Sequence, residues 1–206
     1  SRAPSAVCSL ASLTRNRGPP SPAFGSSTAA HDIPVLNAVT SIQVTPTVSD
    51  ATASVKVNGA TVASGAASSS IPLIEGNNTI TILVTAQDGT TTATYTLTAK
   101  RLPPSTVCSL SGIQLSSGAL SPAFDPGVLS YQATCGNEIS SLQITPSPSD
   151  PTASITVNGN ASGAQGVTMP LSVGVTPISI RVTAEDGSTT QTYTLQVTRQ
   201  PLVFTL

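Results

Sequence analysis

Charged and aromatic side chains are scarce in this 206-residue sequence. Charged residues make up 8% of it, aromatic residues make up 3%, and it contains no tryptophan, whereas about 25% of the residues of soluble globular proteins are charged. Eight Lys and Arg residues and a net charge of −1 do not supply the clustered positive charge that phosphate binding requires. We therefore exclude nucleic acid as a main partner. The 30 serines and 30 threonines must solvate the chain through their hydroxyl groups.

Long apolar segments and common enzyme motifs are also absent from the sequence. No run of 18 apolar residues could cross a bilayer as a helix, and no signal peptide with a basic start and an apolar centre is present. Because the sequence opens as SRAPSAVCSL, we expect it to be part of a longer protein whose targeting signals lie elsewhere. It has one histidine, no GxSxG motif and no paired-carboxylate motif, so we do not expect an enzyme.

The sequence repeats itself at a spacing of about 100 residues. VCSL at 7–10 recurs at 107–110, SIQVTP at 41–46 recurs as SLQITP at 141–146, and TILVTAQDG at 81–89 corresponds to SIRVTAEDG at 179–187 after a two-residue deletion. We predict two repeats, at 7–101 and 107–199, and interpret the chain as two units of a longer array. The flanking segments are predicted to be a linker at 1–6, a proline-rich linker at 102–106 and the start of a next linker or repeat at 200–206.

Within each repeat the hydrophobic pattern has a period of two. Ile80, Ile82 and Val84 alternate with Thr79 and Thr81, which is typical of a half-buried strand. An Asp-Gly pair after this run predicts a hairpin, in which a type I′ turn needs positive φ at both central positions, and an Asn-Gly pair predicts a second hairpin. This pattern predicts an all-β fold of two tandem, immunoglobulin-like antiparallel β-sandwiches with about seven strands each.

The recurring residues resemble a known family. LSSGALSPAFDPGVLSYQAT, SLQITPSPSDPTASITVNG and ISIRVTAEDGSTTQTYTLQVTR are similar to the cadherin-like β-sandwich repeat, and the resemblance covers nearly all of both units. It implies immunoglobulin-like sandwiches that occur in tandem in large surface and extracellular proteins of bacteria and algae, without catalytic activity. The first unit departs from the pattern at Arg15, Pro20, Gly25 and His31. We therefore expect its first strand and following loop to pack differently.

A calcium site, which the family's name suggests, is not expected. Calcium binds six to eight oxygen atoms, usually from clustered carboxylates, whereas the nine acidic residues are spread along the chain, with only Glu185 and Asp186 adjacent. Asp50 and Asp150 lie in repeated Ser-Asp loops, where we expect each carboxylate to bond its own backbone. We therefore predict no metal and no cofactor.

The single histidine, His31, is expected to be structural. It stands where the second repeat has Tyr131, and we expect it to be half buried on a strand. Arg15 and Arg17 could form a small basic patch near His31 that contacts a neighbouring chain or an acidic glycan. The alternative is a merely solvated loop.

The three cysteines predict one disulfide. Cys108 precedes the first predicted strand of the second repeat and Cys135 ends the second strand. Adjacent strands can bring such positions within the Cα separation of roughly 4.4 to 6.8 Å that a disulfide needs, so we predict a Cys108–Cys135 bond worth roughly 3 kcal/mol. The first repeat has Cys8 but Val35 at the second position. Cys8 is either reduced and buried or paired with a cysteine outside this chain.

Two further features concern the surface. The N-glycosylation sequons Asn77-Asn78-Thr79 and Asn160-Ala161-Ser162 fall in predicted turns, and we expect Asn77 and Asn160 to be modified if the host is eukaryotic. Only Lys56 and Arg181 place charge on the repeated VNG and VTA strands. Because exposed strand edges are usually guarded by charge, we expect sheet faces or edges to contact other copies.

These observations predict a non-catalytic structural repeat of a long extracellular or cell-surface protein, acting in a filament, ciliary hair, wall or surface coat. The expected partners are other domains of the same chain, other copies and covalently attached glycans, with no nucleic acid and no direct membrane span. The alternative is an adhesin or carbohydrate-binding appendage module, which an exposed aromatic platform would favour.

Overall fold

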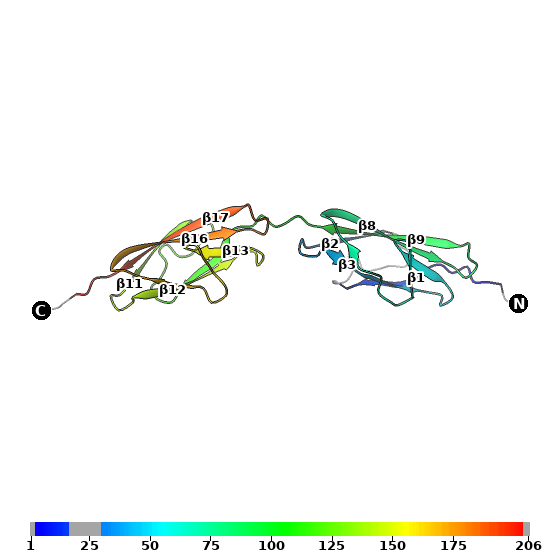
Figure 1. The fold of residues 1–206 in the computed structure, drawn as a ribbon, viewed down its shortest axis with the longest axis horizontal. Coiled ribbons are helices and arrows are strands. Elements are labelled where there is room, and N and C mark those ends of the chain that lie inside the picture. Colours follow the sequence, from blue (N-terminus) through cyan, green and yellow to red (C-terminus); the bar gives the residue numbers. More distant parts are fainter. Residues whose placement is uncertain (1–2, 17–29, 204–206) are drawn as a thin grey trace. The chain divides into compact units, whose positions relative to one another are not determined.

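The computed structural model describes residues 3–16 and 30–203, and it divides into two compact units, Ser1–Pro103 and Pro104–Leu206. All regular secondary structure in these ranges is β-strand, as predicted, and each unit is a two-layer sandwich (Figure 1). No helix in this part of the chain is long and apolar enough to cross a membrane. The division between the units falls within the segment predicted to be the proline-rich linker.

Unit 1 has nine strands among its described residues. They are β1 (Leu10–Arg15), β2 (Ala30–Val35), β3 (Ser41–Ile42), β4 (Val44–Val48), β5 (Ser54–Val57), β6 (Ala60–Val62), β7 (Ile71–Pro72), β8 (Gly76–Thr85) and β9 (Thr92–Arg101). One layer is a five-stranded sheet in the order β2-β9-β8-β5-β6, and the other contains the pairs β1-β4 and β3-β7. The number exceeds the predicted seven because Gln43 separates β3 from β4 and because the short strands β7 and β6 pair with β3 and β5.

Unit 2 repeats this arrangement with eight strands. They are β10 (Leu110–Leu115), β11 (Ser130–Cys135), β12 (Ser141–Pro148), β13 (Ser154–Val157), β14 (Asn160–Ala161), β15 (Val167–Pro170), β16 (Gly174–Thr183) and β17 (Thr190–Arg199). The five-stranded sheet has the order β11-β17-β16-β13-β14, and the second sheet has the order β10-β12-β15. Strand β12 is continuous where unit 1 has β3 and β4, which accounts for the difference of one strand.

One strand pair in each sandwich is parallel, which the antiparallel prediction did not include. Strand β11 runs parallel to β17 from the pair Ser130–Thr194 to the pair Cys135–Arg199, and β2 runs parallel to β9 in the same register. The start of each unit is divided between the layers, with β1 or β10 in one sheet and β2 or β11 in the other. A chain that changes layer after its first strand can run along the last strand in the same direction, and this is what both units do.

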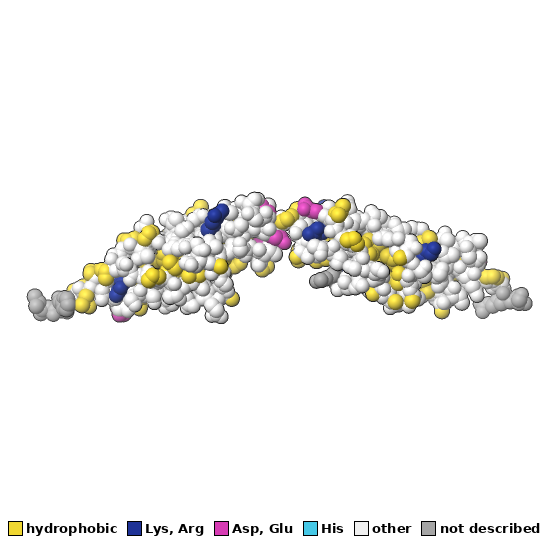
Figure 2. Space-filling view, in the orientation of Figure 1, with side chains coloured by type: hydrophobic (Ala, Val, Ile, Leu, Met, Phe, Trp, Pro, Cys, Tyr) yellow, Lys and Arg dark blue, Asp and Glu magenta, His cyan; other side chains and the backbone are white. Residues whose placement is uncertain are grey.

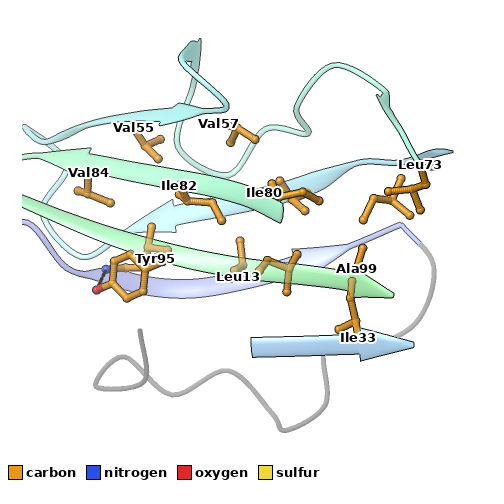
Figure 3. Close-up of a cluster of buried hydrophobic side chains, with 14 of the residues drawn as sticks. Leu13, Ile33, Val55, Val57, Leu73, Ile80, Ile82, Val84, Tyr95 and Ala99 are labelled. Carbon is orange, nitrogen blue, oxygen red and sulfur yellow. Dashed lines mark hydrogen bonds between the residues drawn. The ribbon is translucent and has the colours of Figure 1, made fainter. Parts of the chain in front are cut away.

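Inward-facing aliphatic side chains form the core of each sandwich. In β8, Ile80, Ile82 and Val84 are each 0% exposed, as the alternation predicted, and Figure 3 shows them packed with side chains from the facing layer. Burying one side chain of this size contributes roughly 1.5–3 kcal/mol. In unit 2 the half-buried Phe124 stacks on Tyr131 with ring centroids 5.8 Å apart, which adds aromatic volume to a core that has little of it.

The Asn-Gly hairpins adopt the backbone geometry of a type I′ turn. The φ angles are 46° at Asn58 and 84° at Gly59, and they are 46° at Asn158 and 82° at Gly159. Positive φ at both central positions matches the right-handed twist of the two flanking strands. The predicted hairpin is therefore present in both units.

The Asp-Gly hairpins are also present, but their loops are longer than a type I′ turn. In the Asp88-Gly89 loop of unit 1, Gly89 is the one residue with positive φ, at 72°. The Ala86 N–H donates to the Thr91 carbonyl at 2.9 Å to close this loop. The Asp88 carboxylate accepts the N–H groups of Thr90 and Thr91, both at 2.8 Å. These side-chain bonds stabilise the longer loop, so the turn type did not follow from the Asp-Gly pair alone.

Candidate functional site: the anchored ends of each sandwich

The carboxylates considered for calcium bond their own loops. Asp50 and Asp150 each accept the N–H of the residue two positions later, Thr52 or Thr152, at 2.9 Å, and the hydroxyl of the same residue at 2.7 Å. This is the backbone role that was predicted for them. Within the ranges 3–16 and 30–203, no three His, Cys, Asp or Glu side chains lie close enough together to hold a metal ion.

The predicted basic patch is described only in part. Arg17 lies outside the described residues, while Arg15 is half-buried on β1 and its pKa is lowered by burial. His31 is 2% exposed, so it is more deeply buried than the half-buried position we expected. It pairs with Leu97 on β9, as Tyr131 pairs with Leu195 on β17, and it therefore takes the structural place of that tyrosine.

The structure contradicts the predicted Cys108–Cys135 disulfide, because all three cysteines are free thiols. The Cys108 Sγ lies 3.9 Å from the Gln191 Oε1 near the start of β17, whereas Cys135 is opposite Arg199 at the end of β17. Eight residues of extended strand correspond to about 26 Å, far more than a disulfide can bridge. The prediction assumed that the first two strands of the repeat are neighbours, but β10 and β11 lie in different sheets.

The remaining modification candidates are accessible. Asn77 and Asn160 are both exposed, but they lie at the beginnings of β8 and β14 rather than in turns. Their glycosylation stays a prediction. Cys8 is half-buried and packs against the core of unit 1, and a bond to a cysteine outside this chain also stays a prediction.

The segment that leads into unit 2 is hydrogen bonded to the hairpin between its last two strands. The Ser105 N–H donates to Glu185 Oε2 at 2.8 Å, and the Ser105 carbonyl accepts the N–H of Asp186 at 3.2 Å. The Ser105 hydroxyl bonds the Asp150 carboxylate and is the largest cause that holds the pKa of Asp150 below its ordinary value. We call this set of contacts the N-terminal anchor.

Unit 1 has the same N-terminal anchor with one chemical difference. The Ser5 N–H donates to Gln87 Oε1 at 2.9 Å, and the Ser5 carbonyl accepts the Asp88 N–H at 3.2 Å. Gln87 stands where unit 2 has Glu185. The anchor therefore requires an acceptor oxygen at this position but not a negative charge.

The loop that receives the N-terminal anchor is held by an ionised carboxylate. In unit 2 the hydroxyl and N–H of Thr189 and the N–H of Ser188 donate to Asp186, and these bonds, the Thr189 hydroxyl first, lower the pKa of Asp186 to about 2. In unit 1 the pKa of Asp88 is likewise lowered to about 2, with the Thr91 hydroxyl as the largest cause. Hydrogen bonds to the charged form of a carboxyl favour ionisation, so the Asp88 and Asp186 carboxylates stay ionised well below neutral pH.

A buried tyrosine in the last strand holds the first strand of each unit. The Tyr193 hydroxyl accepts the Leu110 N–H at 3.0 Å and donates to the Pro126 carbonyl at 3.2 Å. In unit 1 the Tyr95 hydroxyl accepts the Leu10 N–H at 3.1 Å, and Figure 3 shows its ring among the core side chains. Because the first and last strands belong to different sheets, these bonds join the two layers.

An arginine and an asparagine hold the opposite end of unit 2. The Arg199 Nε donates to the Asn137 carbonyl at 2.9 Å and its Nη1 donates to the Leu171 carbonyl at 3.0 Å. Beyond the strand, the Gln200 N–H donates to the Cys135 carbonyl at 3.0 Å, and the Asn137 side-chain amide donates to the Gln200 carbonyl at 2.9 Å. We call this set the C-terminal anchor.

The C-terminal anchor of unit 1 uses the same chemistry. Arg101 donates from Nε to the Asn37 carbonyl at 2.8 Å and from Nη1 to the Leu73 carbonyl at 3.2 Å. The Leu102 N–H donates to the Val35 carbonyl at 2.9 Å, and the Asn37 side-chain amide donates to the Leu102 carbonyl at 3.0 Å. Hydrogen bonds that involve a guanidinium are stronger than neutral ones.

The two anchors of a unit lie at opposite ends of the same sandwich. In unit 2 the N-terminal anchor contacts the loop before Thr190, and the C-terminal anchor contains Arg199. Ten residues of extended strand correspond to about 30 Å. The chain therefore enters each unit at one end and leaves it at the other.

These anchors were missed by the sequence analysis, although one signal was available. Ser5 and Ser105, Tyr95 and Tyr193, and Arg101 and Arg199 are identical between the repeats. Recurrence identified these positions but not their partners, because most of the hydrogen bonds join residues about 60 to 85 positions apart.

The surfaces of the units are polar but carry few charges. On the face in Figure 2, lysine, arginine and acidic side chains are scattered rather than clustered. On the five-stranded sheet of unit 1, three cross-strand pairs consist of two threonines each: Thr79–Thr98, Thr81–Thr96 and Thr85–Thr92. A depression of about 370 Å³ in the same unit is lined by residues from Val57 to Pro72, and no side chain in that lining is ionisable.

Fold and anchors together define a class of protein: tandem immunoglobulin-like β-sandwiches through which the chain passes from end to end. The family model of the cadherin-like beta sandwich domain matches residues 9–102 and 109–200. The chain belongs to the cadherin-like β-sandwich family, as the resemblance of its motifs predicted.

A protein of Evansella cellulosilytica named "Putative membrane protein" is 42% identical to this chain over 93 residues. The match covers 44% of this chain and 14% of the Evansella protein. The similarity thus concerns the length of one repeat within a much longer relative.

Similar solved structures include several tandem domains. The fibronectin(III)-like modules of Clostridium thermocellum CbhA share 15% identity, cover 94% of this chain and 98% of that chain, and have a TM-score of 0.24. Surface layer protein SbsC, domains 1–6, shares 13% identity over 96% of this chain and 29% of that chain, with a TM-score of 0.39. Drosophila N-cadherin EC1-4 shares 12% identity over 84% of this chain and 48% of that chain, with a TM-score of 0.31.

Proposed function

We propose that this chain is a non-catalytic structural repeat of a long extracellular or cell-surface protein, in which each sandwich separates the segments that precede and follow it. The observation that carries the proposal is the pair of anchors at opposite ends of each unit. Because the chain is fixed at both ends, about 30 Å apart, each repeat adds a defined length to the protein. Filaments, ciliary hairs, walls and surface coats require such spacing.

The titratable groups of the described residues favour a spacer over an enzyme. General acid–base catalysis needs a titratable group that reaches a substrate. The carboxylates of Asp50, Asp88, Asp150 and Asp186 bond their own loops, and His31 is buried on a core strand. Each of these five side chains is held by its own loop or lies in the core, which supports a structural role for it.

We further propose that other domains, other copies or attached glycans contact the outer faces of the five-stranded sheets. The threonine pairs of unit 1 offer a regular set of hydroxyl donors and acceptors on such a face. The edge strands β6 and β14 contain only three and two residues. Very short edge strands limit pairing with another chain, so the faces are better suited to this contact than these edges.

The adhesin alternative lacks the aromatic platform that would favour it. Tyr95, Tyr131 and Tyr193 are buried, and Phe124 packs against the core of unit 2. Within the described ranges, no aromatic ring is exposed for a sugar to stack on.

A domain swap in the native host tests the spacer function. Residues 7–199 of the full-length protein are replaced by two unrelated immunoglobulin-like sandwiches of equal length, and a deletion of 7–199 serves as the comparison. A spacer predicts that the swapped protein supports normal surface assembly and that the deletion does not. If the swap is as harmful as the deletion, specific side chains are required and the adhesin alternative is favoured.

Labelling of intact cells tests the location. An epitope tag inserted between Asn158 and Gly159, in an exposed hairpin turn, should bind antibody without permeabilisation. Binding only after permeabilisation would contradict an extracellular repeat.

A further inference from the structure

We propose that each sandwich bears tension applied through its two ends, and that the parallel ladder between β11 and β17, like the ladder between β2 and β9, is the element that resists it. The inference goes beyond the spacer function and rests on it only for the idea that force reaches the repeats along the chain. The observation that carries it is how the two strands of the ladder are connected to the rest of the chain.

Tension pulls β11 and β17 in opposite directions along their own axes. The chain reaches β11 at Ser130 from the side of the N-terminal anchor, and it leaves β17 at Arg199 on the side of the C-terminal anchor. A pull on the preceding chain draws β11 toward the N-terminal anchor, and a pull on the following chain draws β17 toward the C-terminal anchor. Because the strands are parallel and pair from Ser130–Thr194 to Cys135–Arg199, all bonds of the ladder are loaded together rather than one after another.

Strand β10 receives the force before β11 does. It pairs antiparallel with β12 from Leu110–Pro148 to Leu115–Ile144, and the Leu110 N–H is also held by the Tyr193 hydroxyl. A pull from the N-terminal side acts along β10, so these bonds are also loaded in shear. If β10 detaches, the force passes along the chain to Ser130 and reaches the parallel ladder.

Hydrogen bonds beyond the two ends of the ladder identify the residues that hold it. The Thr194 N–H donates to the Leu129 carbonyl at 2.8 Å, and the Gln200 N–H donates to the Cys135 carbonyl at 3.0 Å. Backbone groups that face the partner recur at every second residue of a strand. The odd-numbered residues of β11, including Ala133, therefore turn their backbone groups toward β17.

The even-numbered residues of β11 face away from the ladder. The Gln132 N–H donates to the Ser121 carbonyl at 2.8 Å. Unit 1 has Pro34 at the place of Thr134, and proline is tolerated in a strand where its missing N–H is not needed for pairing. Thr134→Pro is thus a matched control for Ala133→Pro, which removes a donor of the ladder.

Single-molecule force spectroscopy on the whole two-unit chain, held at its termini, compares these variants. The wild type should give two unfolding events, one for each unit. Ala133→Pro should raise the unfolding rate of one unit at fixed force by roughly tenfold or more, because it removes a ladder bond and strains the strand. The event of the unchanged unit 1 serves as an internal reference, and Thr134→Pro should leave both events close to wild type. Equal effects of the two prolines would overturn the proposal.

A third variant separates mechanical from general destabilisation. Ile155 is 6% exposed on β13, which is separated from β17 by β16 in the sheet. Ile155→Ala should lower the equilibrium stability of unit 2. For each kcal/mol of free energy of unfolding that is lost, it should raise the unfolding rate under force less than Ala133→Pro does. If the two variants raise the unfolding rate under force by the same factor for each kcal/mol of stability lost, the ladder has no special role and the proposal is wrong.

A second pulling direction covers the case in which Ala133→Pro does not fold. Handles on cysteines placed at Val175 and Gln200, with the three native thiols replaced, pull at the same end of β16 and β17, since Gly174 pairs with Arg199. This pull opens the hairpin pair by pair and should need a several-fold lower force than the end-to-end pull. Equal forces in the two directions would contradict the proposal. If the domain swap and the deletion prove equally harmful while the end-to-end force is high, the spacer function is overturned and this inference stands.

Discussion

Replacing Tyr193 by phenylalanine tests whether a single hydroxyl joins the layers of unit 2. The substitution keeps the ring, which is 0% exposed in the core, and removes only the oxygen. That oxygen accepts the Leu110 N–H at 3.0 Å and donates to the Pro126 carbonyl at 3.2 Å. Leu110 is also 0% exposed, so its N–H finds no water in place of the hydroxyl.

The expected loss follows from these two bonds. A buried donor left without an acceptor costs about 1–3 kcal/mol. Pro126 is exposed, so its carbonyl can bond water and adds little. We expect the free energy of unfolding of unit 2 to fall by about 2 kcal/mol, which for a domain of this size lowers Tm by roughly 8–16 °C.

Chemical and thermal unfolding of the two-unit chain measure this loss, with unit 1 as an internal reference. Thr192→Val on the same strand is the control, because Thr192 is exposed and should change stability by less than about 0.5 kcal/mol. Tyr193→Phe should shift only the transition of unit 2. A shift no larger than that of the control would refute the idea that this hydroxyl joins the layers.

Three further predictions concern charge, thiols and modification. The pKa of Asp186 is lowered to about 2 from about 3.9 in an unfolded chain, so the ionised carboxylate stabilises unit 2 fully above pH 4 and this stabilisation is lost as the pH falls toward 2. In the Asp186→Asn variant, urea unfolding between about pH 4 and 2 should therefore show a smaller loss of stability for unit 2 than for unit 1, which keeps Asp88. A loss for unit 2 as steep as in the wild type would contradict this prediction. Non-reducing peptide mapping should find no disulfide within unit 2, and a linked pair of Cys108 and Cys135 peptides would contradict this. Cys135→Val should change the free energy of unfolding of unit 2 by less than about 1 kcal/mol, because unit 1 carries valine at the corresponding position, Val35. Expression in a eukaryotic secretory pathway should add N-glycans at Asn77 and Asn160, detected as a mass loss on enzymatic deglycosylation. If both sites stay unmodified, exposure of these asparagines is not sufficient for glycosylation and the prediction is wrong.

The local pattern was sufficient for the strands and the overall fold class. Ile80, Ile82 and Val84 occupy the core because every second residue of a strand faces the same side. Asn58 and Gly59 form the expected hairpin because few other residues accept positive φ at both positions. Repetition of these signals in the second unit defined two sandwiches.

The local sequence pattern did not predict which of the two sheets each strand joins. The segment before β11 decides which sheet this strand joins, and no local propensity encodes that path. The parallel pair of each sandwich and the separation of Cys108 from Cys135 both depend on that path. The disulfide prediction therefore failed, although the predicted sandwich fold is present. Asn77 lies in a strand rather than a turn because β8 pairs with β9 back to Gly76, which is a tertiary effect.

The local sequence pattern did not predict the two anchors either, because they also depend on contacts between distant residues. A serine in a linker and an arginine at a strand end are ordinary residues in isolation. Their roles follow from carbonyl and carboxylate partners that the fold brings close from about 60 to 85 positions away.

The distance between the two ends of one unit tests the central claim most directly. Spin labels on cysteines at Thr106 and Gln200, both exposed, in a chain with Cys8→Ser, Cys108→Ser and Cys135→Val, report this distance for unit 2 by pulsed electron paramagnetic resonance. The claim that the chain enters at one end and leaves at the other predicts a narrow distribution centred near 30 Å. A distribution centred below about 15 Å, half the length of the extended strand between the anchors, would place both ends on the same side and contradict the account.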